Sequence, residues 1–383
     1  MKLPVYEVNP ERFWHDPYLD LKNMRRNAPL CFVPQLNAVL FTKRDDIFTC
    51  EKMIDIFSSD QPGGLMTVLM GENMMRKDGE PHLLERKQAF PALSPRTVRD
   101  VWKSRFEDHT AHVLDGFKSS ETVDLVTQYA MPVSGHALRH ITGLTNIGPN
   151  EMDNASQAMI DGVGNYAGDT EVERRCHAAT KLLDDAIDDM LATATVDKAS
   201  MLAVLLNANQ PMGSIRANIK LAISGGQNEP RDAIAGTVSA LLSHPDQLNA
   251  ILNGDQTWLQ AFEEYARWMS PIGMSPRRVA KSSKWNGIEL EPESRVFFMF
   301  GSANRDETVF DQPDTFDIAR NTAKSISFGA GPHFCAGAAA SRTLIAEVAL
   351  PMLFEKFPNI QLVNKTQYGG WAFRGPLEVE VEL

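Results

Sequence analysis

Apolar side chains recur at helical spacing, i, i+3 or i+4 and i+7, over most of the chain, with polar residues between them. This period predicts long helices, whereas strict alternation at 30–42 and 293–300 predicts a small hairpin and a further strand. The predicted helices span 98–115, 122–143, 149–163, 171–193, 214–244, 256–269 and 336–355. The pattern is typical of a mainly α protein with minor β structure: one large helical domain with a small β region.

The segment 53–77 has no steady period, although it carries glycines and several methionines. A long loop with apolar side chains in a compact domain is typical of the wall of a pocket. We therefore expect a loop that lines a binding site here.

The predicted helix 214–244 contains three residues that weaken helices, Gly225, Gly226 and Pro230. A glycine costs about 1 kcal/mol relative to alanine, and a proline inside a helix costs about 3 kcal/mol. Two interpretations remain open. The helix either opens locally to seat a water or a small ligand, or it is two helices that meet at Pro230.

Composition and charge narrow the class of protein. The chain has 383 residues, 43% of them hydrophobic, and a net charge of −11. The charge argues against nucleic acid or an anionic membrane as a partner. No apolar run is long enough to span a membrane, the first residues lack a signal peptide's apolar core, and no linker divides residues 1–383. We expect a single-domain, soluble, cytoplasmic protein.

The most specific segment is SISFGAGPHFCAGAAASR, residues 325–342. A strand-like entry and a glycine-rich turn place Cys335 before a predicted helix, whose N-terminus stabilises a thiolate. A phosphatase-type nucleophile needs an arginine after five intervening residues, but Arg342 follows after six. Zinc would have His333 and Cys335 without a second ligand pair. Haem ligation needs one cysteine and small neighbours, and an inert buried cysteine is the remaining alternative.

The spacing Phe328, Gly331, Cys335 and Gly337 resembles the haem-binding signature of the cytochrome P450 family. The resemblance implies the fold of that family and one haem b (iron protoporphyrin IX). It implies that Cys335 is the axial ligand of the iron and that Phe328 packs beside it. It also implies that His333 hydrogen-bonds a haem propionate.

Three further motifs resemble the family in the same order along the chain: Glu-x-x-Arg at 264–267, PRRVA at 276–280 and ANRD at 303–306. In the family, the Glu-x-x-Arg pair joins a downstream arginine to hold the segment before the haem loop. The resemblance therefore implies a structural set of Glu264, Arg267 and Arg305.

The segment KDGEPHLLERKQAF, 77–90, is similar to the family's helix whose histidine and arginine face the propionates. The resemblance assigns these roles to His82 and Arg86, with Arg278 completing the clamp. Arg277 beside it leaves that register open by one residue.

In this family the distal helix commonly carries Ala-Gly-x-Asp/Glu-Thr where it crosses the haem. Here Gly225 and Gly226 take the Ala-Gly positions, Asn228 the acid and Glu229 the threonine. The departure puts the usual proton delivery in doubt. We predict that Gly226, Asn228 and Glu229 form the distal catalytic site, with Glu229 as the proton carrier. Alternatively, Glu229 pairs with Arg231 and only holds the bend.

The resemblance implies a monooxygenase that activates dioxygen, with a thiolate that favours O–O cleavage. The chain ends soon after the haem loop, so we expect a separate ferredoxin or flavodoxin-type electron donor that docks near Arg86 and Lys87. Loss of the distal threonine leaves two alternatives: a peroxygenase that uses peroxide, or a non-catalytic haem-thiolate protein that binds a ligand.

The residues that the resemblance places around the substrate are apolar. They are Leu65, Met66, Ile223, Gly273, Met274, Trp371 and Phe373. Such a wall suits a small apolar, aromatic substrate, and the GGQNEPRD segment resembles branches that O-demethylate methoxyaromatics. These residues are alternatively ordinary core.

Overall fold

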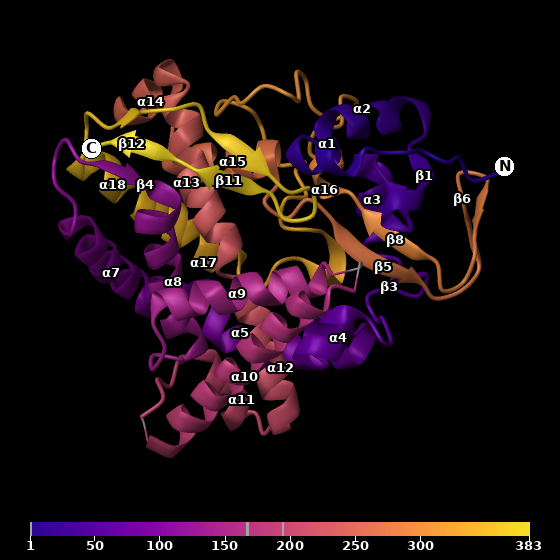
Figure 1. Cartoon of the computed structure of the whole chain (residues 1–383), viewed down its shortest axis with the longest axis horizontal. Coiled ribbons are helices and arrows are strands. Elements are labelled where there is room, and N and C mark those ends of the chain that lie inside the picture. Colours follow the sequence, from indigo (N-terminus) through magenta and orange to yellow (C-terminus); the bar gives the residue numbers. More distant parts are fainter. Residues whose placement is uncertain (1, 166–167, 194) are drawn as a thin grey trace. The chain divides into compact units, whose positions relative to one another are not determined.

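The computed structural model describes residues 2–165, 168–193 and 195–383, and it is mostly helical (Figure 1). The chain forms two compact units. The first comprises the residues up to Gln61, Gly236–Cys335 and Lys365–Leu377. The second comprises Pro62–Ala235, Ala336–Asn364 and Glu378–Leu383. That residues 1–383 act as one domain stays a prediction.

The first unit is built on a five-stranded sheet in the order β1-β2-β8-β5-β3. Its strands are β1 (Leu30–Val33), β2 (Ala38–Phe41), β8 (Arg295–Phe298), β5 (Ser275–Val279) and β3 (Phe57–Ser58). β2 and β8 pair in parallel, and the other neighbours are antiparallel. The rings of Phe41, Phe57 and Phe298 meet edge to face at 5.4 Å on this sheet, which is a preferred aromatic geometry.

Several helices and two further strand pairs belong to the same unit as this sheet. The helices are α1 (Pro10–His15), α2 (Tyr18–Asn27), α3 (Arg44–Cys50), α14 (Pro245–Leu252), α15 (Trp258–Met269) and α16 (Phe300–Ala303). The strands are β6 (Ser283–Trp285) with β7 (Ile288–Leu290), and β10 (Gln367–Gly369) with β11 (Gly375–Glu378). α15 starts with a capping box, in which the Thr257 hydroxyl accepts from the Gln260 N–H at 3.2 Å and Gln260 reaches back.

The second unit is a helical bundle in which α9, α10, α11 and α12 lie side by side (Figure 1). Its helices are α4 (Leu65–Met70), α5 (Gly79–Leu93), α6 (Pro95–Thr97), α7 (Lys103–Asp115), α8 (Met131–Thr142), α9 (Pro149–Val163), α10 (Thr170–Thr193), α11 (Met201–Asn207), α12 (Met212–Ser224), α17 (Ala338–Arg342) and α18 (Leu350–Lys356). Single π-helical stretches lie at Val98–Trp102, Val126–Ala130 and Thr343–Ala349. A small sheet orders β4 (Thr122–Asp124), β12 (Glu380–Glu382) and β9 (Gln361–Leu362). The helix α13 (Asn228–Leu242) runs from this unit into the first.

The pattern predicted the long helices and the hairpin β1–β2 correctly, but it was wrong at short elements. Residues 122–124 are a strand, and the predicted loop 53–77 contains β3, α4 and the 3₁₀ turn Met74–Arg76. Residues 325–328 are not a strand. A helix of six residues, such as α4, is too short to show a period. No helix in the described ranges has the length and apolar character to cross a membrane.

Three histidines gather where α7 packs on α8. The ring of His109 stacks on that of His136 at 4.4 Å, and its Nε2 lies 2.8 Å from Nε2 of His140. Burial, with the cations Arg105 and Arg139 nearby, lowers the pKa of His136 and of His140 to about 4. Asp197 opposes this effect at His140, and Asp108 opposes a similar lowering of the pKa of His109. The cluster is therefore held in its neutral form.

We predict that this cluster makes the fold sensitive to acid. The unfolded histidines bind protons near pH 6.5 and the folded ones near pH 4, so stability is complete above pH 6.5 and is lost as pH falls toward 4. The variant His136→Phe should lose less urea resistance than the parent between pH 7 and pH 5. His177→Gln, which removes an exposed histidine, is the control. An equal loss in the parent and in His136→Phe would contradict the prediction.

Candidate active site

The loop that carries Cys335 is closed by its own backbone. The N–H of Cys335 donates to the carbonyl of Phe328 at 2.9 Å, and α17 begins three residues later at Ala338. The ring of Phe328 packs between Phe262 and Phe334, at 6.2 and 6.3 Å. The loop therefore presents the partly exposed sulfur from a fixed backbone position.

Gly331 is required at the tip of this loop. Its φ is +63°, and a Cβ there would lie 2.8 Å from the carbonyl oxygen of Glu51. The side chain of Glu51 is buried, forms an ion pair with Arg277 at 2.7 Å, and lies 3.5 Å from the N–H of Ala330. Glu51 thus contacts the cysteine loop at Ala330 and Gly331 and stabilises it. Sequence analysis missed Glu51, because it is an ordinary charged residue directly after α3.

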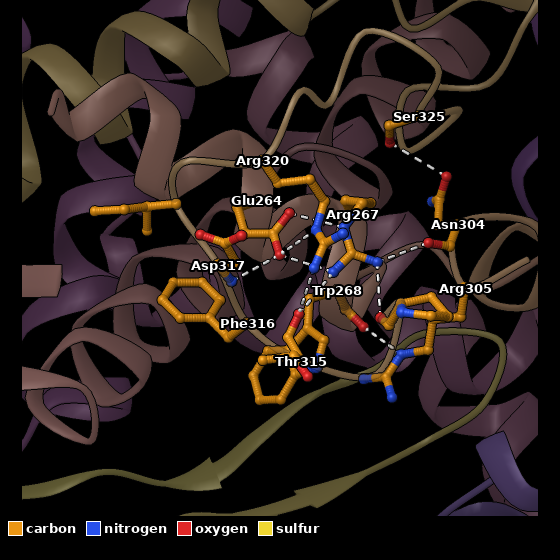
Figure 2. Close-up of polar contacts among 12 residues, drawn as sticks. Glu264, Arg267, Trp268, Asn304, Arg305, Thr315, Phe316, Asp317, Arg320 and Ser325 are labelled. Atoms are coloured by element: carbon orange, nitrogen blue, oxygen red, sulfur yellow. Dashed lines mark hydrogen bonds and ion pairs between the residues drawn. The ribbon is translucent and has the colours of Figure 1, made fainter. Parts of the chain in front are cut away.

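A buried ion pair holds the segment that leads to the loop (Figure 2). Arg267 binds Glu264 with two hydrogen bonds of 2.7 Å, and neither side chain is exposed to solvent. The same guanidinium donates to the carbonyls of Asn304 and Pro313 at 2.8 and 2.9 Å. The backbone N–H of Asp317 donates to Glu264 at 2.9 Å. A charged pair so fully hydrogen-bonded fixes the path of residues 304–317.

Asn304 connects the segment 304–317 to the cysteine loop through hydrogen bonds of its side chain. Its Oδ1 accepts from the N–H of Ile326 at 2.8 Å, and its Nδ2 donates to Ser270 and Ser327 at 2.9 and 3.1 Å. Ser325 also donates to Oδ1, as Figure 2 shows. Sequence analysis missed this fully buried residue, although it stands in the ANRD motif beside the arginine that was chosen.

The predicted third partner, Arg305, was wrong, because Arg320 fills that place. Arg320 Nε donates to Glu264 Oε1 at 3.1 Å (Figure 2). Arg305 instead stacks 3.5 Å over the ring of Tyr18 and donates to the carbonyl of Trp268 at 2.8 Å. Its guanidinium secures helix α2 rather than Glu264. Spacing along the chain does not distinguish two arginines fifteen residues apart on the same irregular segment.

The two predicted propionate ligands in the first unit, His333 and Arg278, contact different residues. His333 Nε2 lies 3.1 Å from the hydroxyl of Ser59. Arg278 binds Glu293 at 2.6 Å and the carbonyl of Asp60 at 2.9 Å, while its neighbour Arg277 is buried against Glu51. The role of Arg278 and His333 toward haem stays a prediction.

Gly273, Met274, Trp371 and Phe373 come together in the first unit. Gly273 donates to the carbonyl of Ala372 at 2.8 Å, and a Cβ there would lie 2.0 Å from the carbonyl oxygen of Trp371. The ring of Trp371 packs at 5.7 Å on Phe13, in the core cluster that Met274 also contacts. Trp371 and Met274 are partly buried against this core cluster, and their role in a substrate pocket stays a prediction.

In the second unit, the predicted helix 214–244 is interrupted at residues 225–227. α12 ends at Ser224 and α13 begins at Asn228. Pro230 is the third residue of α13, where its missing N–H has no helical partner to lose. The break therefore lies before the proline and not at it. Gly226 is required, because a Cβ would lie 2.5 Å from the carbonyl oxygen of Ala222.

Polar side chains surround this break. Gln227 and Arg231 both donate to Asp153, at 3.0 and 2.9 Å, and Arg231 also binds Asp232 at 2.9 Å. Asn228 donates to Gln157 at 2.6 Å. Arg231 is thus engaged by the two aspartates, and no hydrogen bond to Glu229 is found for it among the described residues.

Glu229 is partly exposed as a whole, but both oxygens of its carboxyl group are buried. Neither carboxyl oxygen has a hydrogen-bond partner among the described residues, and the same holds for Gln227 Oε1 and Asn228 Oδ1. Burial, together with the charge of Asp232, raises the pKa of Glu229 to about 8. Burial likewise raises the pKa of Asp232 to about 6, although Arg231 opposes it. Glu229 is therefore mostly a neutral carboxylic acid at pH 7.

The other predicted residues of this unit lie on three helices. His82 and Arg86 lie one turn apart on α5, and His82 is buried. Leu65 and Met66 are partly exposed on α4, whereas Ile223 is fully buried near the end of α12. Their roles toward haem and substrate stay predictions.

The four cysteines differ in a way that fits haem ligation. Cys31, Cys50 and Cys176 are buried, and burial raises the pKa of Cys31 to about 12 and that of Cys176 to about 11. Only Cys335 is partly exposed. Over the described ranges, no group of three or more His, Cys, Asp or Glu side chains is arranged to hold a metal ion. The donor set is a single thiolate on a rigid glycine-rich loop, which fits haem iron.

Comparisons with known proteins agree with this site. The family model described as Cytochrome P450 matches residues 259–360. Cytochrome P450 107B1 of Saccharopolyspora erythraea is 27% identical over 310 residues, which cover 79% of this chain and 74% of that protein. The steroid C26-monooxygenase of Mycolicibacterium smegmatis is 27% identical over 357 residues, which cover 89% of this chain and 85% of that protein. The structure of a Bacillus megaterium cytochrome P450 with testosterone superposes with a TM-score of 0.87 at 20% identity, covering 97% and 98%.

The family model, the curated relatives and the fold support a haem-thiolate cytochrome P450 monooxygenase, and proteins of that family bind haem b. The predicted fold is confirmed.

We predict that Glu264 is coupled to Arg320 and not to Arg305. In double-mutant cycles with Glu264→Gln, measured by urea denaturation of the haem-loaded protein, Arg320→Ala should show a coupling energy of about 1–2 kcal/mol. Arg305→Ala should destabilise through lost stacking on Tyr18, but additively with Glu264→Gln, within about 0.5 kcal/mol. A larger coupling for Arg305 would restore the sequence prediction.

Proposed function

We propose that this P450 hydroxylates or O-demethylates a small apolar, aromatic substrate, with Cys335 as the axial thiolate. The observation that carries the proposal is the single partly exposed cysteine on the rigid glycine loop. When bound, thiolate-ligated haem supplies dioxygen activation. The apolar side chains of Leu65, Met66 and Phe373 favour an uncharged substrate. Relatives named for steroids also support an apolar substrate.

We place Glu229 in the role that a threonine commonly has in this family. An acid with a pKa near the working pH both gives and takes protons effectively. The side-chain oxygens of Gln227 and Asn228 have no donor among the described residues, and buried acceptors of this kind are normally satisfied by water or ligand. Together with Glu229, these side chains would hold a short chain of ordered water. Arg231, bound to Asp153 and Asp232, would offset part of the negative charge near Glu229.

Use of peroxide is the second candidate function. A neutral acid can donate a hydrogen bond to bound peroxide, and the replacement of threonine by Glu229 is the observation that favours it. The two candidates separate when product formation is compared with an electron donor and with hydrogen peroxide.

Electrons would come from a separate ferredoxin or flavodoxin-type protein. Lys87 on α5 and Arg96 on α6 are exposed, and they offer positive charge on a chain whose net charge is −11. Such a patch steers an acidic donor. We place the docking of the donor on this surface.

The test of the haem-thiolate assignment is Cys335→Ser. A neutral hydroxyl is a much poorer ligand than a thiolate, so the reduced carbon monoxide complex should lose its thiolate-type absorption band. Cys176→Ser, at a buried thiol, is the matched control and should keep the band. A thiolate band that survives in Cys335→Ser would end the proposal.

The test of the proton carrier is Glu229→Gln, which keeps size and removes the acid. Substrate binding and the carbon monoxide band should survive, while peroxide-supported turnover falls more than tenfold, within the usual range of about 10²–10⁴ for acid–base help. Donor-supported turnover should release more peroxide per product. In the parent, the acid form is lost as pH rises through about 8, so activity should fall there, and Glu229→Gln should lack that inflection.

The control for this test is Asp161→Asn, which changes a carboxyl group at the outer edge of the network, where it accepts from Gln157 at 2.8 Å. Activities within twofold of the parent in Glu229→Gln would make Glu229 a structural residue. Proton delivery would then have to be sought at Asn228 or Asp232.

A further inference from the structure

Helix α4 is bounded by glycines in conformations that other residues rarely adopt. Gly63 has φ of +69° and Gly71 has φ of +91°. The buried residues Leu69 and Met70 hold the helix by apolar packing, and Leu69 Cδ1 lies 3.0 Å from the position of a Cβ on Gly162 of α9. Two permissive positions around one helical turn allow it to move as a unit.

The turn that follows α4 is attached differently, by a buried amide. Asn218 of α12 is fully buried, and its Oδ1 accepts from the backbone N–H of Met74 at 2.9 Å. Its Nδ2 donates to Glu85 Oε2 on α5 at 2.9 Å. One amide side chain therefore binds a backbone donor of the turn and a carboxylate acceptor of another helix.

Glu85 binds the same turn with its second oxygen. Glu85 Oε1 accepts from Lys77 Nζ at 2.5 Å and from the hydroxyl of Ser214 at 3.1 Å. The side chains of Glu85 and Lys77 are 12% and 17% exposed, so the ion pair is largely shielded from solvent. Residues 74–77 are thus held at both ends by Asn218 and Glu85.

These contacts make the turn a fixed end for α4. Moving residues 74–77 would separate the N–H of Met74 from Asn218 Oδ1 and Lys77 from Glu85, which is costly because these groups are largely shielded from water. Among the described residues, no comparable polar contact joins residues 65–70 to α5 or α12, and Leu69 and Met70 hold α4 by apolar packing. The boundary between a fixed and a movable segment therefore falls at Gly71.

We infer that Asn218 and Glu85 are positioning residues that fix the end of the α4 segment and so control exchange of ligands with the substrate pocket. The inference rests on the proposed function, in which Leu65 and Met66 of α4 line that pocket. With the pair intact, α4 opens about Gly63 and Gly71 while residues 74–77 stay in place. With the pair broken, the whole segment loosens, and ligands leave faster.

The chemistry of the pair allows a test by reversal. Asn218→Asp places a carboxylate against that of Glu85, which repels it and removes the donor. The double variant Asn218→Asp with Glu85→Gln restores the pairing with the roles exchanged: the glutamine amide donates to the aspartate, and its oxygen still accepts from Lys77 and Ser214. Rescue by this exchange is not expected of a residue that merely fills space.

The probe is 4-phenylimidazole, whose nitrogen binds ferric haem iron and whose ring occupies the pocket. Its dissociation rate, measured by stopped-flow absorption on the haem-loaded protein, should rise at least fivefold in Asn218→Asp and return to within twofold of the parent in the double variant. Lys77→Met, which removes one contact at a partly exposed position, should raise the rate two- to threefold and covers the case in which Asn218→Asp does not fold.

The matched control is Lys220→Met, on the same helix, where Lys220 is buried and binds Asp184 of α10 at 2.8 Å. It should lower stability without changing the dissociation rate. Unchanged rates in both Asn218→Asp and Lys77→Met, failure of the double variant to restore the rate, or equal acceleration in Lys220→Met would overturn the inference. A parent without the thiolate-type carbon monoxide band would instead overturn the proposed function, so the two failures are distinguishable.

Discussion

The ion pair of Glu264 and Arg267 is the contact on which the cysteine loop depends. Both side chains are withdrawn from water, so each charge must be balanced within the protein. The carboxylate is satisfied by Arg267, Arg320 and the N–H of Asp317, and the guanidinium by three backbone carbonyls. An irregular segment without regular secondary structure thereby gains a defined path. Asn304 then passes that path to residues 325–327, and the backbone bond from Cys335 to Phe328 closes the loop.

The interruption between α12 and α13 differs from this ion pair, because polar groups there are left without partners. There the regular helix is interrupted at residues 225–227, and nearby side chains have acceptors without donors among the described residues. A structure selected only for stability would pair or remove such groups, because each costs about 1–3 kcal/mol when unsatisfied. The charges of Glu264 and Arg267 lie in a closed hydrogen-bond network, whereas the interruption holds an acid, Glu229, whose pKa is raised to about 8 by burial.

Sequence analysis predicted those parts of the fold in which the apolar pattern repeats many times. Helices such as α9 and α10 repeat their apolar positions over many turns, and the hairpin β1–β2 alternates strictly. Short elements were missed because three to six residues do not define a period. The strand β4 was read as helix for this reason, since its three residues precede a long helical pattern.

The site was predictable where one residue type is irreplaceable and unpredictable where several would serve. Cys335 and the glycines around it are constrained by chemistry and by backbone conformation, so their spacing was recognisable by its resemblance to the haem-binding signature of the family. Arg320 and Arg305 are chemically identical, and only the folded path of residues 304–320 decides which of them reaches Glu264. Glu229 shows the limit most clearly. Its position could be counted from the sequence, but its raised pKa depends on burial of the carboxyl group and on the charges of Asp232 and Arg231 nearby, which no spacing records.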